Sequence, residues 1–165
     1  MQKQRKNTQV VIKITSGSKH YQALSKHIEY ISREGNLPLL SSDMETYLGK
    51  DENLEVKNIY KKDGISIPNF GEEKKEKCHT INMVFSMNAP EIKLKEAVYR
   101  TIKEKFPNNF FVISFHGDTD NPHCHVCLKV AKNDGKKNKY QKTRFSKFKS
   151  KFCKKINRFS NRSNG

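Results

Sequence analysis

Residues 115–130 read FHGDTDNPHCHVCLKV and contain three of the six histidines of the chain, His116, His123 and His125. Residues 110–116 (FFVISFH) are rich in aromatic and β-branched side chains, which predicts a strand, and an apolar run resumes after His123. The six residues between these runs, GDTDNP, have the composition of a hairpin loop. Side chains at i and i+2 of a strand point to the same face, so His123 and His125 project together and the hairpin brings His116 opposite them. The stretch therefore predicts a β-hairpin on which three imidazoles converge.

Three converging imidazoles match the ligand count of a metal site with open coordination positions, because a closed structural site uses four protein ligands. A single histidine on a strand is usually only partly buried, and a His-x-His pair alone is a weak motif. Three histidines and Asp118 on one hairpin are harder to explain by packing. Alternation also turns Cys124 away from the face of its flanking histidines. We therefore predict that His116, His123 and His125 bind a metal ion.

The charge of the chain indicates a polyanionic partner. Its 33 Lys and Arg outnumber 17 Asp and Glu, a formal net charge of +16, and residues 129–165 hold fourteen Lys or Arg against one acid, Asp134. This uneven surplus, with aromatic residues threaded through it, favours nucleic acid. Without an apolar run near 18 residues or a signal peptide, we expect no membrane span and a cytoplasmic protein. The four cysteines form no paired CxxC knuckles, and we expect reduced thiols.

The hydrophobic pattern predicts a fold of the α+β class, an antiparallel β-sheet flanked by helices. We expect a strand at 10–14, a helix at 19–32, a strand at 78–87, a helix from about 88 to 106, the histidine hairpin, and a last helix at 142–159. Residues 37–77 carry turn signals and a charged run. We interpret them as an irregular insertion with one short helix near 43–48 and a strand or two. The domain is expected to span 10–160, between a basic disordered arm at 1–9 and a tail at 161–165.

The first predicted helix leaves a tyrosine outside its apolar stripe. The stripe has spacings of three and four residues and consists of Tyr21, Leu24, Ile28 and Ile31. At about 100° per residue, Tyr30 lies on the opposite side of the helix. A tyrosine that faces away from the core near a helix end is available for contact or chemistry, although an ordinary surface tyrosine follows the same pattern.

The last predicted helix combines an aromatic stripe with a basic face. Its apolar positions are Phe145, Phe148, Phe152, Ile156 and Phe159. We expect the stripe to pack in the core. The remaining surface, which includes Lys147 and Lys151, is expected to contact phosphates.

Three stretches of the chain together resemble a known superfamily. His116-x-Asp118, followed by residues 121–125 (NPHCH), is similar to the metal motif of HUH endonucleases. Residues 27–35 (HIEYISREG) resemble their nucleophile motif, in which a tyrosine near the end of the first helix is followed by a basic residue and Gly. Ser86 matches the small middle motif. The stretches occur in family order over about 10–130, and they resemble more narrowly the conjugative relaxases of the MOBP group, including the T-DNA border-nicking type.

The resemblance implies site- and strand-specific DNA nicking at a plasmid or mobile-element transfer origin, on a sandwich like that of rolling-circle initiators. Tyr30 would become linked to the 5′-phosphate of the cut strand and leave a free 3′-OH. The three histidines would hold Mg²⁺ or Mn²⁺. Asp118 would either orient a histidine or accept the proton of the tyrosine, and its motif position does not separate these roles.

The same resemblance implies where DNA would bind and which proteins would assist. DNA contacts are expected from Arg33, Ser86, Lys129, Lys147 and Lys151. The partner would be single-stranded or supercoiled DNA at the origin, bound by a monomer with accessory relaxosome proteins. Relaxases are usually longer, so the chain is interpreted as either a catalytic domain or a short relative.

Two other functions fit these residues. A replication initiator or transposase of the same superfamily shares the chemistry and acts on a replication origin or an element end. A non-catalytic DNA-binding module could keep a structural metal and the basic surface, but it would not nick supercoiled plasmid that carries its site.

Overall fold

The histidine hairpin lies at the centre of the sheet. In the computed structural model, which describes residues 10–72, 78–87 and 90–136, β5 (Asn109–His116) and β6 (His123–Lys132) pair antiparallel. Beyond β6 lie β4 (Thr80–Met87) and β1 (Val10–Ser16), and beyond β5 lie β2 (Leu39–Ser41) and β3 (Thr46–Tyr47). The strand order is β1-β4-β6-β5-β2-β3, and every neighbouring pair is antiparallel.

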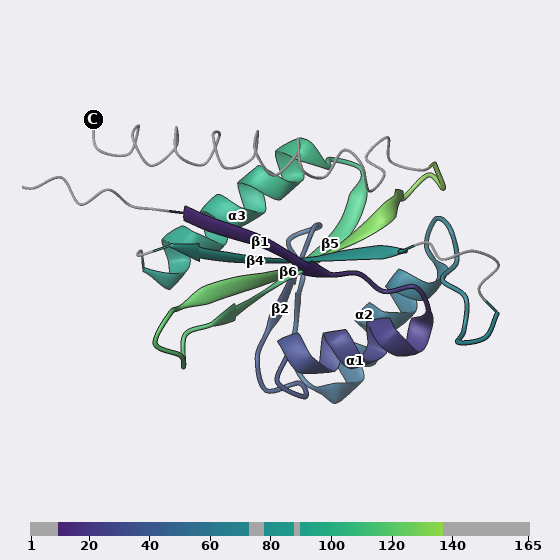
Figure 1. Cartoon of the computed structure of the whole chain (residues 1–165), viewed down its shortest axis with the longest axis horizontal. Coiled ribbons are helices and arrows are strands. Elements are labelled where there is room, and N and C mark those ends of the chain that lie inside the picture. The colour runs from purple at the N-terminus through teal and green to yellow at the C-terminus, as the bar shows by residue number, and fades with distance from the viewer. Residues whose placement is uncertain (1–9, 73–77, 88–89, 137–165) are drawn as a thin grey trace, which may run out of the picture.

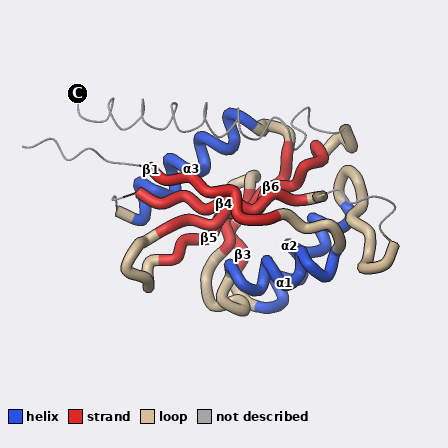
Figure 2. The backbone as a smooth tube through the Cα atoms, in the orientation of Figure 1, coloured by secondary structure: helices blue, strands red, loops and turns tan. Residues whose placement is uncertain are grey.

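Helices cover both faces of this sheet. α3 (Glu91–Lys105) lies on one face, and α1 (Tyr21–Ile31) and α2 (Lys50–Lys62) lie next to each other on the other face (Figures 1 and 2). The predicted α+β class, an antiparallel sheet flanked by helices, is therefore confirmed. The strands and helices predicted over 10–32, 78–106 and 110–130 are present as well.

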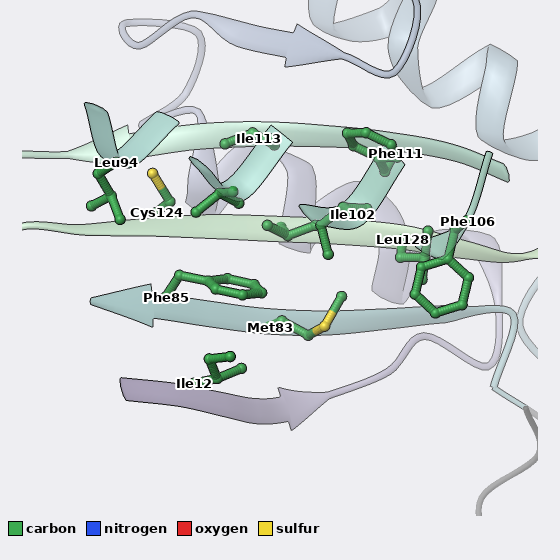
Figure 3. Packing of buried hydrophobic residues seen from close by; sticks show 12 residues of the cluster. Ile12, Met83, Phe85, Leu94, Ile102, Phe106, Phe111, Ile113, Cys124 and Leu128 are labelled. Atoms are coloured by element: carbon green, nitrogen blue, oxygen red, sulfur yellow. The ribbon is translucent and has the colours of Figure 1, made fainter. Parts of the chain in front are cut away.

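Strand alternation divides the core between the two faces. Phe111 and Ile113 of β5 pack under α3, in a cluster that includes the stripe of that helix (Figure 3). Phe110 and Val112, one position away, pack under α1 and α2 instead. The buried members on the α3 side are Ile12, Met83, Phe85, Leu94, Val98, Ile102, Phe106, Phe111, Ile113, Cys124, Val126 and Leu128. Those on the other side are Leu24, Ile28, Ile31, Leu39, Val56, Tyr60, Ile67, Phe110, Val112 and Cys127.

The same alternation decides which face receives the polar end of the hairpin. Ser114 and His116 continue the series of Val112 along β5, and His125 continues that of Cys127 along β6. Because the period of a strand is two residues, all of them face α1 and α2. The apolar positions of the hairpin therefore build the α3 core, and its chemistry lies under α1.

The helix predicted near residues 43–48 is wrong, because that stretch forms a turn and β3. Met44 adopts a positive φ of 65°, which ends any helix there. The helix of this region is α2, which begins after Gly49 and has thirteen residues. Its buried positions are Asn53, Val56, Lys57 and Tyr60, of which two are polar, so it has a weak apolar stripe in the sequence. Much of the predicted irregular insertion is thus regular structure.

Lys129 does not lie where a phosphate contact was predicted. Its side chain is 2% exposed, and its ammonium donates hydrogen bonds to the carbonyl oxygens of Tyr60, at 2.6 Å, and Asp63. These carbonyls lie at the C-terminal end of α2, where carbonyls lack partners within the helix. Lys129 therefore caps α2 from the neighbouring strand and is not presented to DNA.

Several predictions fall outside the described residues. They concern the arm at 1–9, the last helix at 142–159 with Lys147 and Lys151, Cys153, and the tail at 161–165. Within 10–72, 78–87 and 90–136, no helix has the length and apolar composition that a bilayer span requires.

The burial of Lys129 predicts a pH-dependent contribution to stability. Burial lowers the pKa of Lys129 to about 8, whereas an unfolded lysine titrates near about 10.4. The lysine therefore contributes stability that is present above about pH 10.4 and is lost as the pH falls through the folded value. As the pH rises from about 8 to about 10.4, the free energy of unfolding of the wild-type chain should increase relative to that of Lys129→Met. Urea unfolding at a series of pH values measures the difference.

Lys13→Met is the matched control, because Lys13 is an exposed lysine on β1. Its pH profile should run parallel to that of the wild type. A parallel profile for Lys129→Met as well would contradict the lowered pKa of the buried Lys129.

Candidate active site

The three histidines of the hairpin converge as the sequence predicts. His116 ends β5 directly opposite His123, which begins β6, and His125 follows two residues later. One ring nitrogen from each lies within 4.8 Å of the others. Among the described residues, this is the one cluster of three or more His, Cys, Asp or Glu that could hold a metal ion.

Backbone carbonyls select which nitrogen of two imidazoles is free. His116 Nε2 lies 2.7 Å from the carbonyl oxygen of Ile31, and His123 Nδ1 lies 2.8 Å from that of Asn121. A carbonyl oxygen only accepts, so both nitrogens carry the proton, and the lone pairs are left on His116 Nδ1 and His123 Nε2. Metal-bound histidines are held by this kind of outer hydrogen bond.

Burial favours the neutral form of two of these imidazoles, His125 and His116. It lowers the pKa of His125 to about 3, with further lowering from the charges of His116 and His123. Burial likewise lowers the pKa of His116, against the hydrogen bond to Ile31 that raises it. His123 Nε2 lies only 3.1 Å from His125 Nε2, an arrangement that one shared proton or one shared cation satisfies. Neutral nitrogens without a carboxylate among them fit a divalent cation whose full charge stays available.

Tyr30 lies beside this cluster on the exposed side of α1. Its ring centroid is 5.6 Å from that of His125 and 6.3 Å from that of His116. Tyr30 faces away from the core and is 59% exposed. The opposite face of α1, with Leu24, Ile28 and Ile31, is fully buried on the sheet. The apolar stripe thus holds the helix on the sheet. Tyr30, which directly precedes the last stripe residue, presents its phenol next to the three histidines.

The turn after α1 places Arg33 between the hairpin and the helix. Arg33, Glu34 and Gly35 have positive φ values of 50°, 57° and 90° in succession. A Cβ on Gly35 would lie 2.9 Å from the carbonyl carbon of Gly49, so the close approach of the two loops requires glycine. The chain therefore reverses tightly enough to bring the Arg33 side chain back over the site.

Arg33 rather than a histidine is the partner of Asp118. The guanidinium Nη2 lies 3.2 Å from the carboxylate of Asp118 and 3.5 Å from His116 Nδ1. Of the two roles predicted for Asp118, direct orientation of an imidazole is not seen. Asp118 contacts the triad through Arg33.

Ser86 lies at the other side of the cluster. It pairs with His123 across β4 and β6, and directly paired residues of antiparallel strands project to the same face. The structure therefore brings together Tyr30, Arg33, Ser86, Asp118 and the three histidines. Lys129 lies apart from them, at the end of α2.

Three residues near the site had no predicted role. Ser114 donates its hydroxyl to the Ile31 carbonyl at 2.7 Å, which ties β5 to the end of α1. Lys57 of α2 forms an ion pair at 2.6 Å with Glu29 of α1, the residue before Tyr30, and so links the two helices next to the site. His27 is one helical turn before Tyr30, with ring centroids 6.3 Å apart, and burial lowers its pKa to about 4. Only His27 carried a signal in the sequence, its position three residues before the tyrosine.

Comparison with known proteins bears on this geometry. Residues 42–159 match the model of the relaxase family described as MobA/VirD2-like, nuclease domain. No curated protein matches the chain. The matched stretch contains the whole histidine hairpin and Asp118, and Tyr30 lies before it. Because the match covers well over half of the chain and the fold is the expected antiparallel sandwich, this chain belongs to the MobA/VirD2-like relaxase family and carries its nuclease domain.

Proposed function

We propose that this chain nicks one DNA strand by transesterification, with Tyr30 as the nucleophile. The observation that carries the proposal is the exposed Tyr30 ring, 5.6 Å from the ring of His125 at the edge of the histidine cluster. A tyrosine in the core could not reach a phosphate, and one on a distant surface would have no cluster beside it. Membership of the relaxase family supports DNA nicking in mobilisation, which favours a transfer origin over a replication origin.

The proposed reaction exchanges one phosphate ester for another. The Tyr30 hydroxyl oxygen bonds to phosphorus, and the bond from phosphorus to the 3′-oxygen breaks. The products are a 5′-phosphotyrosyl strand and a free 3′-OH, so no water is consumed and rejoining stays feasible. The phenol loses a proton and the departing 3′-oxygen gains one. Asp118, 65% exposed in its side chain and held by Arg33, is the proposed acceptor of the first, and the surrounding water supplies the second.

His116, His123 and His125 are the proposed ligands of a divalent cation. A bound cation would offset the negative charge that develops on the scissile phosphate. Imidazole is a weaker match for Mg²⁺ than for later metals of the first row, so Mn²⁺ is the better candidate of the two. The hydrogen bonds from His116 to Ile31 and from His123 to Asn121 hold the rings ready for it.

Further DNA contacts are proposed from groups around the site. Arg33 and Ser86 border the histidine cluster. The basic segment, residues 129–165, includes Lys147 and Lys151, which are proposed to contact the phosphate backbone of DNA. We propose that the chain acts as a monomer on single-stranded or supercoiled DNA at a transfer origin, together with accessory proteins.

Tyr30→Phe tests the nucleophile. The change removes one hydroxyl from an exposed side chain, so the fold and DNA binding should persist while the covalent adduct disappears. The assay incubates the chain with a pool of single-stranded DNA and Mn²⁺ and resolves adducts on a denaturing gel. Mass spectrometry of the wild-type adduct should place the nucleotide on residue 30. Tyr47→Phe is the control, and a nucleotide found on Tyr21 or Tyr99 would refute the assignment.

His123→Ala tests the ligand set by metal binding as well as by activity. Loss of a direct ligand should weaken Mn²⁺ binding by more than the roughly 10- to 100-fold that follows loss of an outer partner. Adduct formation should stop, and the urea unfolding profile should stay close to that of the wild type. Cys124→Ala, one residue along on the opposite face, should keep wild-type Mn²⁺ affinity by titration. Retained affinity in His123→Ala would exclude this histidine as a ligand.

Neutralising the basic segment tests its contact with DNA. Changing Lys147, Lys149, Lys151 and Lys154 to Gln should weaken binding to all single strands about equally. The dependence of the logarithm of the association constant on that of salt concentration should also flatten, by about 0.7 per lost contact. Fluorescence anisotropy over a salt series measures both. An unchanged slope would show that these lysines do not contact DNA.

A further inference from the structure

A second feature lies next to the proposed site and shares the Arg33–Asp118 ion pair with it. It is an open pocket of about 430 Å³ between the turn after α1, the N-terminal half of α3 and the tip of β5. Arg33 and Asp118 line it and also border the histidine cluster. A strand whose phosphate reaches Tyr30 therefore has this pocket as its neighbour.

One wall of the pocket is aromatic and another is aliphatic. Phe115 offers its ring, with the ammonium of Lys95 at 5.8 Å from the ring centroid, and Leu37 and Pro38 lie on the aliphatic side. Gly117 also lines the pocket, and a Cβ on this residue would lie 2.6 Å from Cε1 of Phe115. The absence of a side chain at Gly117 keeps that part of the ring uncovered. A flat aromatic ligand can stack on such a surface.

The charges around the pocket cancel. Arg33 pairs with Asp118 at 3.2 Å, and Lys95 pairs with Glu91 at 2.6 Å, so two cations meet two carboxylates. A phosphate subsite needs surplus positive charge. The chain as a whole has a net charge of +16, but the pocket has no such surplus. The neutral balance here favours an uncharged, flat group over a phosphate.

We propose that this pocket binds one nucleobase of the DNA strand next to the phosphate that Tyr30 attacks, stacked on Phe115. Asn36, which lines the pocket, donates one amide N–H to the carbonyl oxygen of Arg33 at 2.9 Å. Its second N–H and its amide oxygen remain as a donor and an acceptor for the edge of the base. The pocket then contributes base preference near the nick, whereas the basic segment contributes affinity without preference. The inference rests on the proposed function for its ligand, a single DNA strand, and for the position of the phosphate that Tyr30 attacks.

The test uses binding, so it does not depend on cleavage. The full chain carrying Tyr30→Phe selects strands from a randomised single-stranded DNA library, and the bound pool is sequenced. The same selection is run with Leu37→Trp, which fills the pocket, and with Phe115→Leu, which keeps apolar volume and removes the ring. Leu54→Trp is the matched control, because Leu54 is an exposed leucine of α2 outside the pocket.

The parent and the control should prefer particular bases at one position, and both pocket variants should lose that preference. Affinity for the selected strand should fall roughly tenfold in the pocket variants, as expected for one lost base–aromatic stack. Unfolding curves identify any variant that has lost its fold, and the other variant then decides. Unchanged preference and affinity in a folded pocket variant would overturn the proposal.

Two further arms separate related outcomes. Titration with dAMP, dGMP, dCMP and dTMP asks whether a free nucleotide is the ligand. Tight binding of a mononucleotide that Leu37→Trp abolishes, without base preference in strands, would overturn the proposal. Adduct formation by the wild-type chain is assayed separately. Pocket-dependent preference without an adduct would support the pocket and overturn the proposed nicking function.

Discussion

The arrangement of the site depends on one backbone carbonyl, that of Ile31 at the end of α1. It accepts hydrogen bonds from the Ser114 hydroxyl and the His116 ring, both at 2.7 Å, so the last two inward-facing residues of β5 hold the helix end. The same bond fixes which nitrogen of His116 is free. Because Tyr30 directly precedes Ile31, the helix cannot shift along the sheet without separating the phenol from the imidazoles.

The sheet isolates this polar chemistry from the larger core. Alternation along β5 and β6 sends Phe111 and Cys124 to the α3 side and His116 and His125 to the α1 side. The α3 core is continuous and apolar, so it stabilises the hairpin without any contribution from the histidines. Burial under α1 in turn lowers the pKa of His125 to about 3, which suits a metal ligand and is unfavourable for a solvated charge.

The turn after α1 links the site to the pocket beside it. Left-handed backbone at Arg33 and Glu34 costs on the order of 1–3 kcal/mol each, and such strain persists where surrounding contacts hold it. Here the close packing of Gly35 against Gly49 holds it. This reversal of the backbone after α1 places the Arg33 side chain against Asp118. The residues that follow form one wall of the pocket, so a single reversal of the backbone shapes both features.

The sequence by itself determined what depends on local periodicity. A period of two residues predicts that the hairpin histidines share a face, and a period of 3.6 predicts that Tyr30 leaves the core stripe of α1. Only the tertiary structure decided features that join distant segments. Two of the buried positions of α2, Asn53 and Lys57, are polar and bond to Ser32 and Glu29, so the sequence of this helix shows only a weak apolar stripe. The burial of Lys129 follows from α2, and the pairing of Asp118 with Arg33 spans 85 positions of the chain. Such contacts leave no periodic trace, because their partners are set by how the elements pack and not by spacing along the chain.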